Sequence, residues 1–459
     1  MKTTKNKIVY EENINGIEGK AIAVVFPDSI EEIKNIVKFS PDNVDIVPRG
    51  AGTSFVGGVI PQNSIVIDMS KMNKIIDINP ARKIAIVEAG ILVSELNEEL
   101  EQYDLEFPIE TLFAGIETLG GIIAKNSAGN REIKYGRAIK WINQLEAING
   151  KGEHIRVSKS DLSDFVGMEG TTGIIVKATL HLTNKKKRSF TILKALSLED
   201  VFAVNKKLRL NQDVSSIDLL SREVSSLLGL EKKYHIFIEF ENNEGNFKAE
   251  NYEKYLKLKQ RVYKAIASDG YFYMGNAKLL TDSLYDFLVY LEENQIPYFG
   301  HLASGVIYPF FKPENIGRLQ ELSNFVKKLK GRVCYNFGIG LTKKDFVELG
   351  EKELIKRVKR RYDPKNKFNK GKLIDFTPST EIKIEIQDKT LSELTESTEL
   401  TEQTELAKPT RLAAESKLEL EQLEAKQTSE QLEQKAIANS DNTLTREYNK
   451  DNKQEEGLK

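Results

Sequence analysis

In the N-terminal part of the chain, residues 16–186, short apolar runs alternate with segments of helical spacing. Continuous apolar runs predict strands at 45–47 and 85–89. Apolar residues that recur three and four positions apart predict helices at 31–39 and 93–100. We call residues 16–186 the first region and expect it to be built from strands and helices in turn.

The second region, residues 187–376, carries the same two patterns in a different order. Its predicted elements are strands at 189–195 and 234–240 and helices at 198–210, 254–266, 279–291 and 318–329. This mixture is typical of an α+β domain and suits a lid over the first region. His235 lies within the second of these strands, where we expect it to be a structural residue.

Residues 377–459 have a different composition from the rest of the chain. A triplet of Ser or Thr, Glu and Leu recurs there every six residues, at 392–394, 398–400 and 404–406. This spacing turns successive leucines by roughly 600° on a helix, so that they share no face. A stretch of this kind, without aromatic residues, cannot bury enough surface to offset the entropy of ordering it. We expect a low-complexity disordered tail, in which residues 412–436 could form a helix on a protein partner.

Composition limits the classes of protein that remain. The 459 residues are 40% hydrophobic with a formal net charge of −1, which allows two or three domains and gives no reason to expect a nucleic-acid partner. The one cysteine, Cys334, excludes an internal disulfide and suits a reducing compartment. The polar N-terminus and the lack of an apolar run of ~18 residues predict neither a signal peptide nor a transmembrane segment. We therefore expect a cytoplasmic protein, at most peripherally docked to a membrane.

Three glycine-dense segments, at 48–58, 117–129 and 169–175, carry the candidate chemistry of the first region. Glycines expose backbone N–H groups with no side chain in the way, which suits the binding of a diphosphate. The hydroxyl groups of Thr53 and Ser54 can add further donors. The candidate cofactor-binding residues are Pro48, Arg49, Gly50, Ala51, Gly52, Thr53, Ser54, Glu117, Thr118, Gly120, Gly121, Asn126, Ser127, Gly129, Glu169, Gly173, Ile174 and Ile175.

Together these segments resemble the FAD-binding domain of the vanillyl-alcohol oxidase and p-cresol methylhydroxylase superfamily, in its glycolate oxidase and D-lactate dehydrogenase branch. The resemblance runs from about Gly16 to Thr183, and further matches include the runs at 24–33, 64–73 and 85–90. It implies an α+β protein. A PCMH-type FAD-binding domain of two α/β subdomains would occupy 16–186, an α+β oxidase C-terminal domain 187–376, and the disordered tail the rest.

The cofactor that this resemblance implies is FAD, bound without a covalent link. Some relatives attach the flavin through a histidine in the first loop, where this chain has Thr53. The loop also does not open a helix with G-x-G-x-x-G spacing, so a Rossmann-type site is a poor match.

The second region resembles the family's oxidase domain but departs from it where the chemistry is expected. Metal-using relatives have H-A-G-D-G-N-L-H followed by G-E-H-G-I-G. Two histidines and the glutamate hold a divalent metal that lowers the pKa of the substrate hydroxyl, and the last histidine takes the proton. The corresponding residues here are His301 and Tyr308, then Asn336 and Phe337. Because one imidazole is not a metal site, we expect no metal.

His301 and Tyr308 are thus the candidate catalytic residues. His301 could serve as a residual base or a hydrogen-bond donor to substrate, and a packing role stays equally open. Tyr308 could replace a base only if nearby positive charge lowered its pKa from ~10.

The resemblance implies an FAD-dependent oxidoreductase that oxidises a small 2-hydroxy acid, of the D-lactate or glycolate type, by hydride transfer to the flavin. It also implies an electron acceptor, which could be a quinone, a cytochrome or an electron-transfer flavoprotein. Two alternatives stay open because of the altered motifs. One is a flavin-binding subunit without its own dehydrogenase turnover, and the other is a flavoprotein that oxidises a sugar or an alcohol.

Overall fold

The computed structural model describes residues 2–13, 16–111, 113, 115–242, 249–333 and 338–378. The tail predicted to be disordered lies outside the described residues from 379 onward, and so do Cys334, Asn336 and Phe337. Helices and sheets are mixed throughout the described part, which confirms the expected α+β class. Among the described residues, no helix has the length and apolar character needed to cross a membrane.

The first region contains a four-stranded sheet in the order β1-β2-β4-β3. Its elements are β1 (Lys2–Thr3), β2 (Lys20–Phe26), β3 (Asp45–Arg49) and β4 (Gln62–Asp68), with the short helix α1 (Ile8–Glu11) and the helix α2 (Ile30–Phe39). Strands β2, β4 and β3 run parallel, and α2 buries Ile33 and Val37 in a cluster with Ile46 of β3. Because β3 ends at Arg49, the first glycine-dense loop leaves from the carboxyl edge of this sheet.

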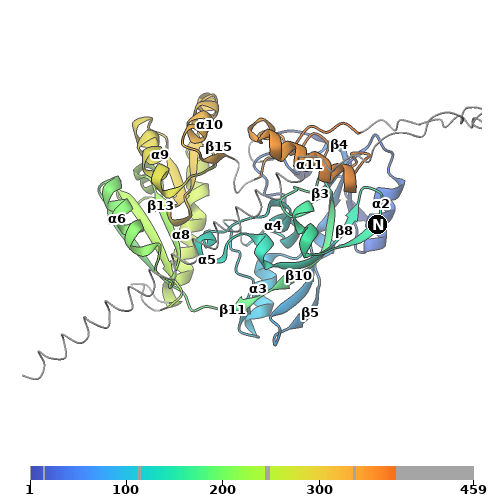
Figure 1. Ribbon diagram of the computed structural model, residues 1–459, viewed down its shortest axis with the longest axis horizontal. Coiled ribbons are helices and arrows are strands. Elements are labelled where there is room, and N and C mark those ends of the chain that lie inside the picture. Colours follow the sequence, from blue (N-terminus) through green and yellow to red (C-terminus); the bar gives the residue numbers. More distant parts are fainter. Residues whose placement is uncertain are drawn as a thin grey trace, which may run out of the picture. The chain divides into compact units, whose positions relative to one another are not determined.

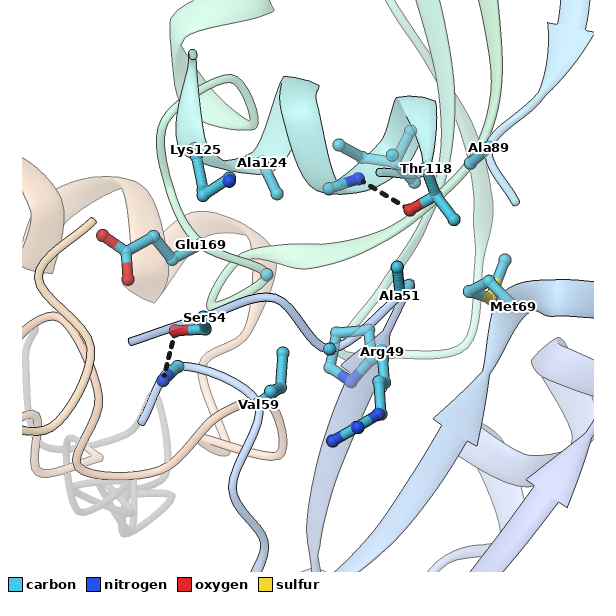
Figure 2. A pocket seen from close by; sticks show the side chains of 18 of the residues that line it. Arg49, Ala51, Ser54, Val59, Met69, Ala89, Thr118, Ala124, Lys125 and Glu169 are labelled. Carbon is cyan, nitrogen blue, oxygen red and sulfur yellow. Dashed lines mark hydrogen bonds between the residues drawn. The ribbon is translucent and has the colours of Figure 1, made fainter. Parts of the chain in front are cut away.

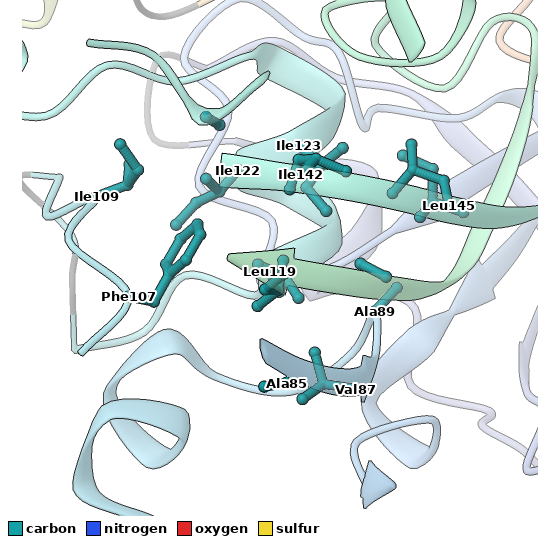
Figure 3. Close-up of a cluster of buried hydrophobic side chains, with 14 of the residues drawn as sticks. Ala85, Val87, Ala89, Phe107, Ile109, Leu119, Ile122, Ile123, Ile142 and Leu145 are labelled. Atoms are coloured by element: carbon teal, nitrogen blue, oxygen red, sulfur yellow. The ribbon is translucent and has the colours of Figure 1, made fainter. Parts of the chain in front are cut away.

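A five-stranded antiparallel sheet follows, in the order β5-β6-β10-β8-β9. Its strands are β5 (Ile75–Asn79), β6 (Ile84–Glu88), β8 (Ile142–Asn149), β9 (His154–Val157) and β10 (Gly173–His181), and the nearby elements are α3 (Val93–Glu101), β7 (Leu105–Glu106), α4 (Leu119–Lys125), α5 (Glu132–Tyr135) and β11 (Thr183–Asn184). Figure 3 shows Leu119, Ile122 and Ile123 of α4 in the core against this sheet. This packing fixes the second glycine-dense segment, from which α4 begins.

The second region is built on an eight-stranded sheet. Its strands are β12 (Ser189–Ala195), β13 (Val214–Leu220), β14 (Tyr234–Phe240), β15 (Tyr273–Met274), β16 (Ala277–Lys278), β17 (Tyr298–His301), β18 (Val306–Phe311) and β19 (Arg332–Val333). The helices α6 (Leu198–Leu208), α9 (Thr281–Glu293) and α10 (Arg318–Lys328) share one core cluster with the sheet, and Figure 1 shows them beside its strands. The helices α7 (Arg222–Leu227) and α8 (Ala249–Ser268) share a separate cluster with it.

The chain returns to the first region after α11 (Leu349–Tyr362). The amide N–H of Ile46, in β3, donates to the carbonyl of Lys367 at 2.8 Å, and the amide of Asn369 donates to the carbonyl of Ile46 at 3.0 Å. The end of the predicted second region therefore packs against the parallel sheet of the first. The domain boundary at 186/187 stays a prediction.

Candidate cofactor pocket and active site

The three glycine-dense segments meet around one pocket, which we call the cofactor pocket (Figure 2). Counted together with its open mouth, it holds about 860 Å³ of space between the protein atoms. All the predicted cofactor-binding residues line it except Asn126, Ser127 and Gly129. The loop after β3, the start of α4 and the start of β10 are thus brought together from three separate parts of the sequence.

Gly50 and Gly52 are required by the geometry of the first loop. A Cβ added at Gly50 would lie 2.0 Å from the Thr118 hydroxyl oxygen, and Gly52 has φ +77°, a conformation that other residues rarely adopt. Thr118 in turn caps α4, since its hydroxyl accepts a hydrogen bond from the Gly121 amide at 3.4 Å. The Gly58 amide likewise donates to Ser54 Oγ at 3.0 Å (Figure 2). The loop and α4 thus approach each other so closely that only glycine fits.

Glu169 lies in the pocket wall but already uses both of its carboxylate oxygens. They accept hydrogen bonds from the amides of Ile339 and Gly340 at 2.6 and 2.9 Å. Burial raises the pKa of Glu169, and these two backbone donors partly oppose that rise. The side chain therefore anchors the returning C-terminal part of the chain beside the pocket.

The sequence motifs did not identify Lys125 and Asn369, which also line the pocket. Lys125 ends α4, and its ammonium lies 2.5 Å from Glu117 Oε1. Asn369 reaches the pocket from the far end of the chain, and its side-chain amide donates to the carbonyl of Glu169 at 2.7 Å. Asn369 could not be found from its neighbours in the sequence, because its place in the pocket depends on a contact with Glu169, 200 residues away.

A second, smaller cavity contains both candidate catalytic residues, and we call it the His301 cavity. Its lining includes Glu117, Lys125, Ser127, Asn130, His301 and Tyr308. Glu117 and Lys125 line the cofactor pocket as well, so the two spaces share a wall. Ser127 and Gly129, predicted to bind the cofactor, lie on the His301 side of that wall.

Asn126 faces a different cleft and has a structural role in this conformation. It ends α4 with φ 48°, and its side-chain oxygen accepts a hydrogen bond from the Ile139 amide at 3.1 Å. Its cofactor-binding role stays a prediction.

His301 is held in one orientation by its neighbours. Its Nδ1 lies 2.7 Å from Asp218 Oδ1, and both side chains are buried. Phe299 and Tyr308 contact the imidazole edge to face, each with its ring centre 5.5 Å away. Burial would raise the pKa of Asp218, but Lys259 and His301 together hold it below its usual value. His301 is therefore backed by a charged carboxylate, an arrangement that the sequence motifs did not reveal.

Within the described residues, no group of three or more His, Cys, Asp or Glu side chains is arranged to hold a metal ion. The other buried histidine, His235, contacts Ser225 Oγ through Nδ1 at 3.0 Å and lines neither cavity. This contact agrees with its expected structural role.

Comparison with known proteins identifies the first region. Residues 21–158 match the model of an FAD binding domain. The chain is 24% identical over 424 residues to a D-2-hydroxyglutarate dehydrogenase of Stutzerimonas stutzeri, which covers 76% of this chain and 90% of the relative. It is 24% identical over 419 residues to a D-lactate dehydrogenase of Archaeoglobus fulgidus, which covers 76% and 91%. It is 34% identical over 182 residues to the glycolate oxidase subunit GlcD of Bacillus subtilis. This match covers 37% of this chain and 39% of the relative.

The chain is therefore a flavoprotein, and the glycine cradle around Gly50 and Gly52 fits the FAD that the domain match implies. More specifically, it is an FAD-linked oxidoreductase, and it is similar to members of the glycolate oxidase and D-lactate dehydrogenase branch of the vanillyl-alcohol oxidase and p-cresol methylhydroxylase superfamily. Its substrate is a small molecule.

Proposed function

We propose that the protein oxidises a small 2-hydroxy acid, of the D-lactate or glycolate type, to the 2-oxo acid. The names of its relatives support this substrate class. The observation that carries the proposal is the wall of Glu117 and Lys125, which separates the cofactor pocket from the cavity that holds His301. A substrate in the His301 cavity would lie next to the cofactor pocket and in contact with a candidate base.

In this reaction the hydroxyl group loses its proton, the neighbouring C–H bond breaks and a C=O bond forms. FAD, when bound, accepts the electron pair of the C–H bond as hydride. His301 takes the hydroxyl proton, because it carries the only imidazole among the described residues that line the cavity. Tyr308 packs against the imidazole and restricts its rotation.

We further propose that Pro48, Arg49, Gly50, Ala51, Gly52, Thr53 and Ser54, with the lining residues of α4 and β10, hold FAD non-covalently. Thr53 stands in the loop where a covalent link would need a histidine. Among the described residues that line the cofactor pocket there is no histidine, cysteine or tyrosine to form such a link. Precipitation with acid should therefore release all the flavin into the supernatant.

The visible absorption spectrum of the purified protein, taken anaerobically before and after addition of D-lactate, glycolate or D-2-hydroxyglutarate, tests the function. Bleaching of the flavin band by one of these acids is the expected result. A flavin band that none of them bleaches would overturn the proposal and favour a subunit without turnover, or, if a sugar or an alcohol bleaches it, a different substrate class. The reoxidation rates with a quinone, a cytochrome and an electron-transfer flavoprotein would then identify the acceptor.

A further inference from the structure

A chain of three buried charged or titratable side chains ends at the His301 cavity. Asp218 of β13 and His301 of β17 are direct partners on adjacent antiparallel strands, so their side chains emerge side by side on one face of the sheet. Lys259 of α8 approaches from above that face and places its ammonium 2.7 Å from Asp218 Oδ2. The side chains of Asp218, His301 and Lys259 are 0%, 4% and 7% exposed.

The two oxygens of Asp218 are thus divided between two partners. Oδ2 faces Lys259, and Oδ1 accepts from Nδ1 of His301. An ionised carboxylate can only accept hydrogen bonds, so Nδ1 of His301 carries a proton, and in the neutral imidazole the lone pair lies on Nε2. No hydrogen bond to Nε2 comes from the described part of the chain, which leaves this nitrogen for a ligand in the cavity.

Two orphaned polar groups lie in the same cavity. Ser127 and Asn130 are 2% and 7% exposed, and the Ser127 hydroxyl and the Asn130 amide nitrogen have no hydrogen-bond partner among the described residues. A buried donor without a partner costs about 1–3 kcal/mol, and a bound oxygen atom would remove that cost. Both groups can donate to the oxygen atoms of a carboxylate or a hydroxyl group.

We propose that Lys259, Asp218 and His301 form a metal-free triad. In this triad Asp218 and Lys259 position His301 to take the substrate hydroxyl proton at Nε2, while Ser127 and Asn130 bind substrate oxygens. The inference rests on the proposed function. The proton moves from the hydroxyl oxygen to Nε2, the carbon gives its hydride to FAD, and the resulting imidazolium is stabilised by Asp218. Lys259 keeps Asp218 ionised, so the carboxylate does not take the proton itself.

The tautomer of His301 tests the positioning of its ring by this triad, and the test needs no turnover. The chain has 4 histidines, so long-range ¹H–¹⁵N correlation spectra of protein labelled with [¹⁵N]histidine should be simple, and H301Q assigns the signal. We expect Nδ1 to be protonated in the wild-type holoprotein. In D218N, Lys259 would attract the amide oxygen and turn the amide NH₂ toward His301, which should shift the proton to Nε2. A wild-type His301 protonated on Nε2, or a tautomer unchanged in D218N, would overturn the proposed triad.

The rate of anaerobic flavin reduction then tests the chemical role. We expect H301Q and D218N to lower the limiting rate by roughly 10²–10⁴-fold with little change in substrate affinity, and imidazole to restore part of the rate of H301A. The matched control is H235N, which removes the buried histidine that lines neither cavity and should keep the wild-type rate. Fast D218N would overturn the positioning role while leaving the proposed function intact. The other outcome is a His301 that is protonated on Nδ1 in a protein whose flavin is bleached by no 2-hydroxy acid. It would overturn the proposed function, and with it the role of His301 as the base.

Discussion

Arg131 of the first region and Glu239 of β14 in the second are joined by two hydrogen bonds, from Nε to Oε1 at 2.6 Å and from Nη2 to Oε2 at 3.1 Å. Both side chains are buried, and Arg131 also lies 2.6 Å from Glu110 Oε2. Burial alone would raise the pKa of Glu239, but the Arg131 guanidinium holds it well below its usual range. The pair therefore stays ionised while linking the region of the cofactor pocket to the region of His301.

Replacing Arg131 with methionine should destabilise the fold strongly, because it leaves Glu239 and Glu110 without their common partner. Loss of one member of a buried ion pair costs about 3–5 kcal/mol, which urea denaturation would measure. The control is Lys194→Met, which removes a half-exposed pair with Glu231 and should leave the denaturation midpoint unchanged. Equal midpoints for Arg131→Met and wild type would contradict the importance of the link.

Gly50→Ala should abolish FAD binding while leaving the fold intact. The new Cβ would displace the Thr118 hydroxyl, 2.0 Å away, and narrow the approach between the first loop and α4. The measurement is the ratio of flavin absorbance to protein after gel filtration with added FAD. Gly350→Ala, in α11, is the matched control, since its Cβ would meet no atom within 4 Å. Full flavin content in Gly50→Ala would show that the loop does not hold the cofactor.

Chelation should leave the rate of flavin reduction unchanged. Nδ1 of His301 is already taken by Asp218, and the described residues offer no cluster that could hold a metal. Dialysis against EDTA, followed by metal analysis and the anaerobic assay with the acid that proves active, would check this. Activity that is lost on dialysis and restored by Zn²⁺ or Mn²⁺ would mean that a metal takes part.

The first region's glycine loops could be recognised from sequence, because the requirement they meet is local. At Gly50 and Gly52 the backbone itself must approach another segment, and only glycine permits that. The helices can also be predicted from sequence, because the spacing of apolar residues is a local property of the chain. The spacing of apolar residues predicts 198–210 and 318–329, and α6 and α10 begin at the expected residues and end within two residues of the expected ends.

Asp218, Lys259 and Asn369 could not be found in this way. Asp218 and His301 are 83 residues apart and meet only because β13 pairs with β17, and Lys259 joins them through the packing of α8. A lone aspartate in an apolar strand carries no local signal of its partner. The sequence predicts the cofactor loops and His301 as site residues, whereas the positions of the charged groups behind His301 depend on sheet register.

Two buried lysines near the end of the described chain should respond to mutation in opposite ways. Lys359 has an ion pair with Asp363 Oδ2 at 2.8 Å and also donates to the carbonyls of Thr171 and Phe368 at 2.7 and 3.0 Å. Lys372 is 1% exposed, and the one hydrogen bond from its ammonium that we identify goes to Asn369 Oδ1 at 2.9 Å. Burial, helped by the positive charge of Arg49, lowers the pKa of Lys372 to about 7 against the opposing influence of Asp45 and Glu169.

The unfolded chain keeps Lys372 protonated up to its ordinary pKa of 10.5, so between pH 7 and 10.5 the unfolded state binds more protons than the folded state. The free energy of unfolding therefore rises with pH across this window. The free-energy cost of burying the charged Lys372 ammonium is fully present below pH 7. Lys372→Met should stabilise the protein at pH 6.5 by up to about 5 kcal/mol, and the gain should fade by pH 10. Lys359→Met, which strands Asp363 in the interior, should destabilise at both pH values. Urea denaturation of both variants at pH 6.5 and 10 measures this contrast, and a Lys372→Met protein less stable than wild type at pH 6.5 would mean that its ammonium has a partner worth more than its burial costs.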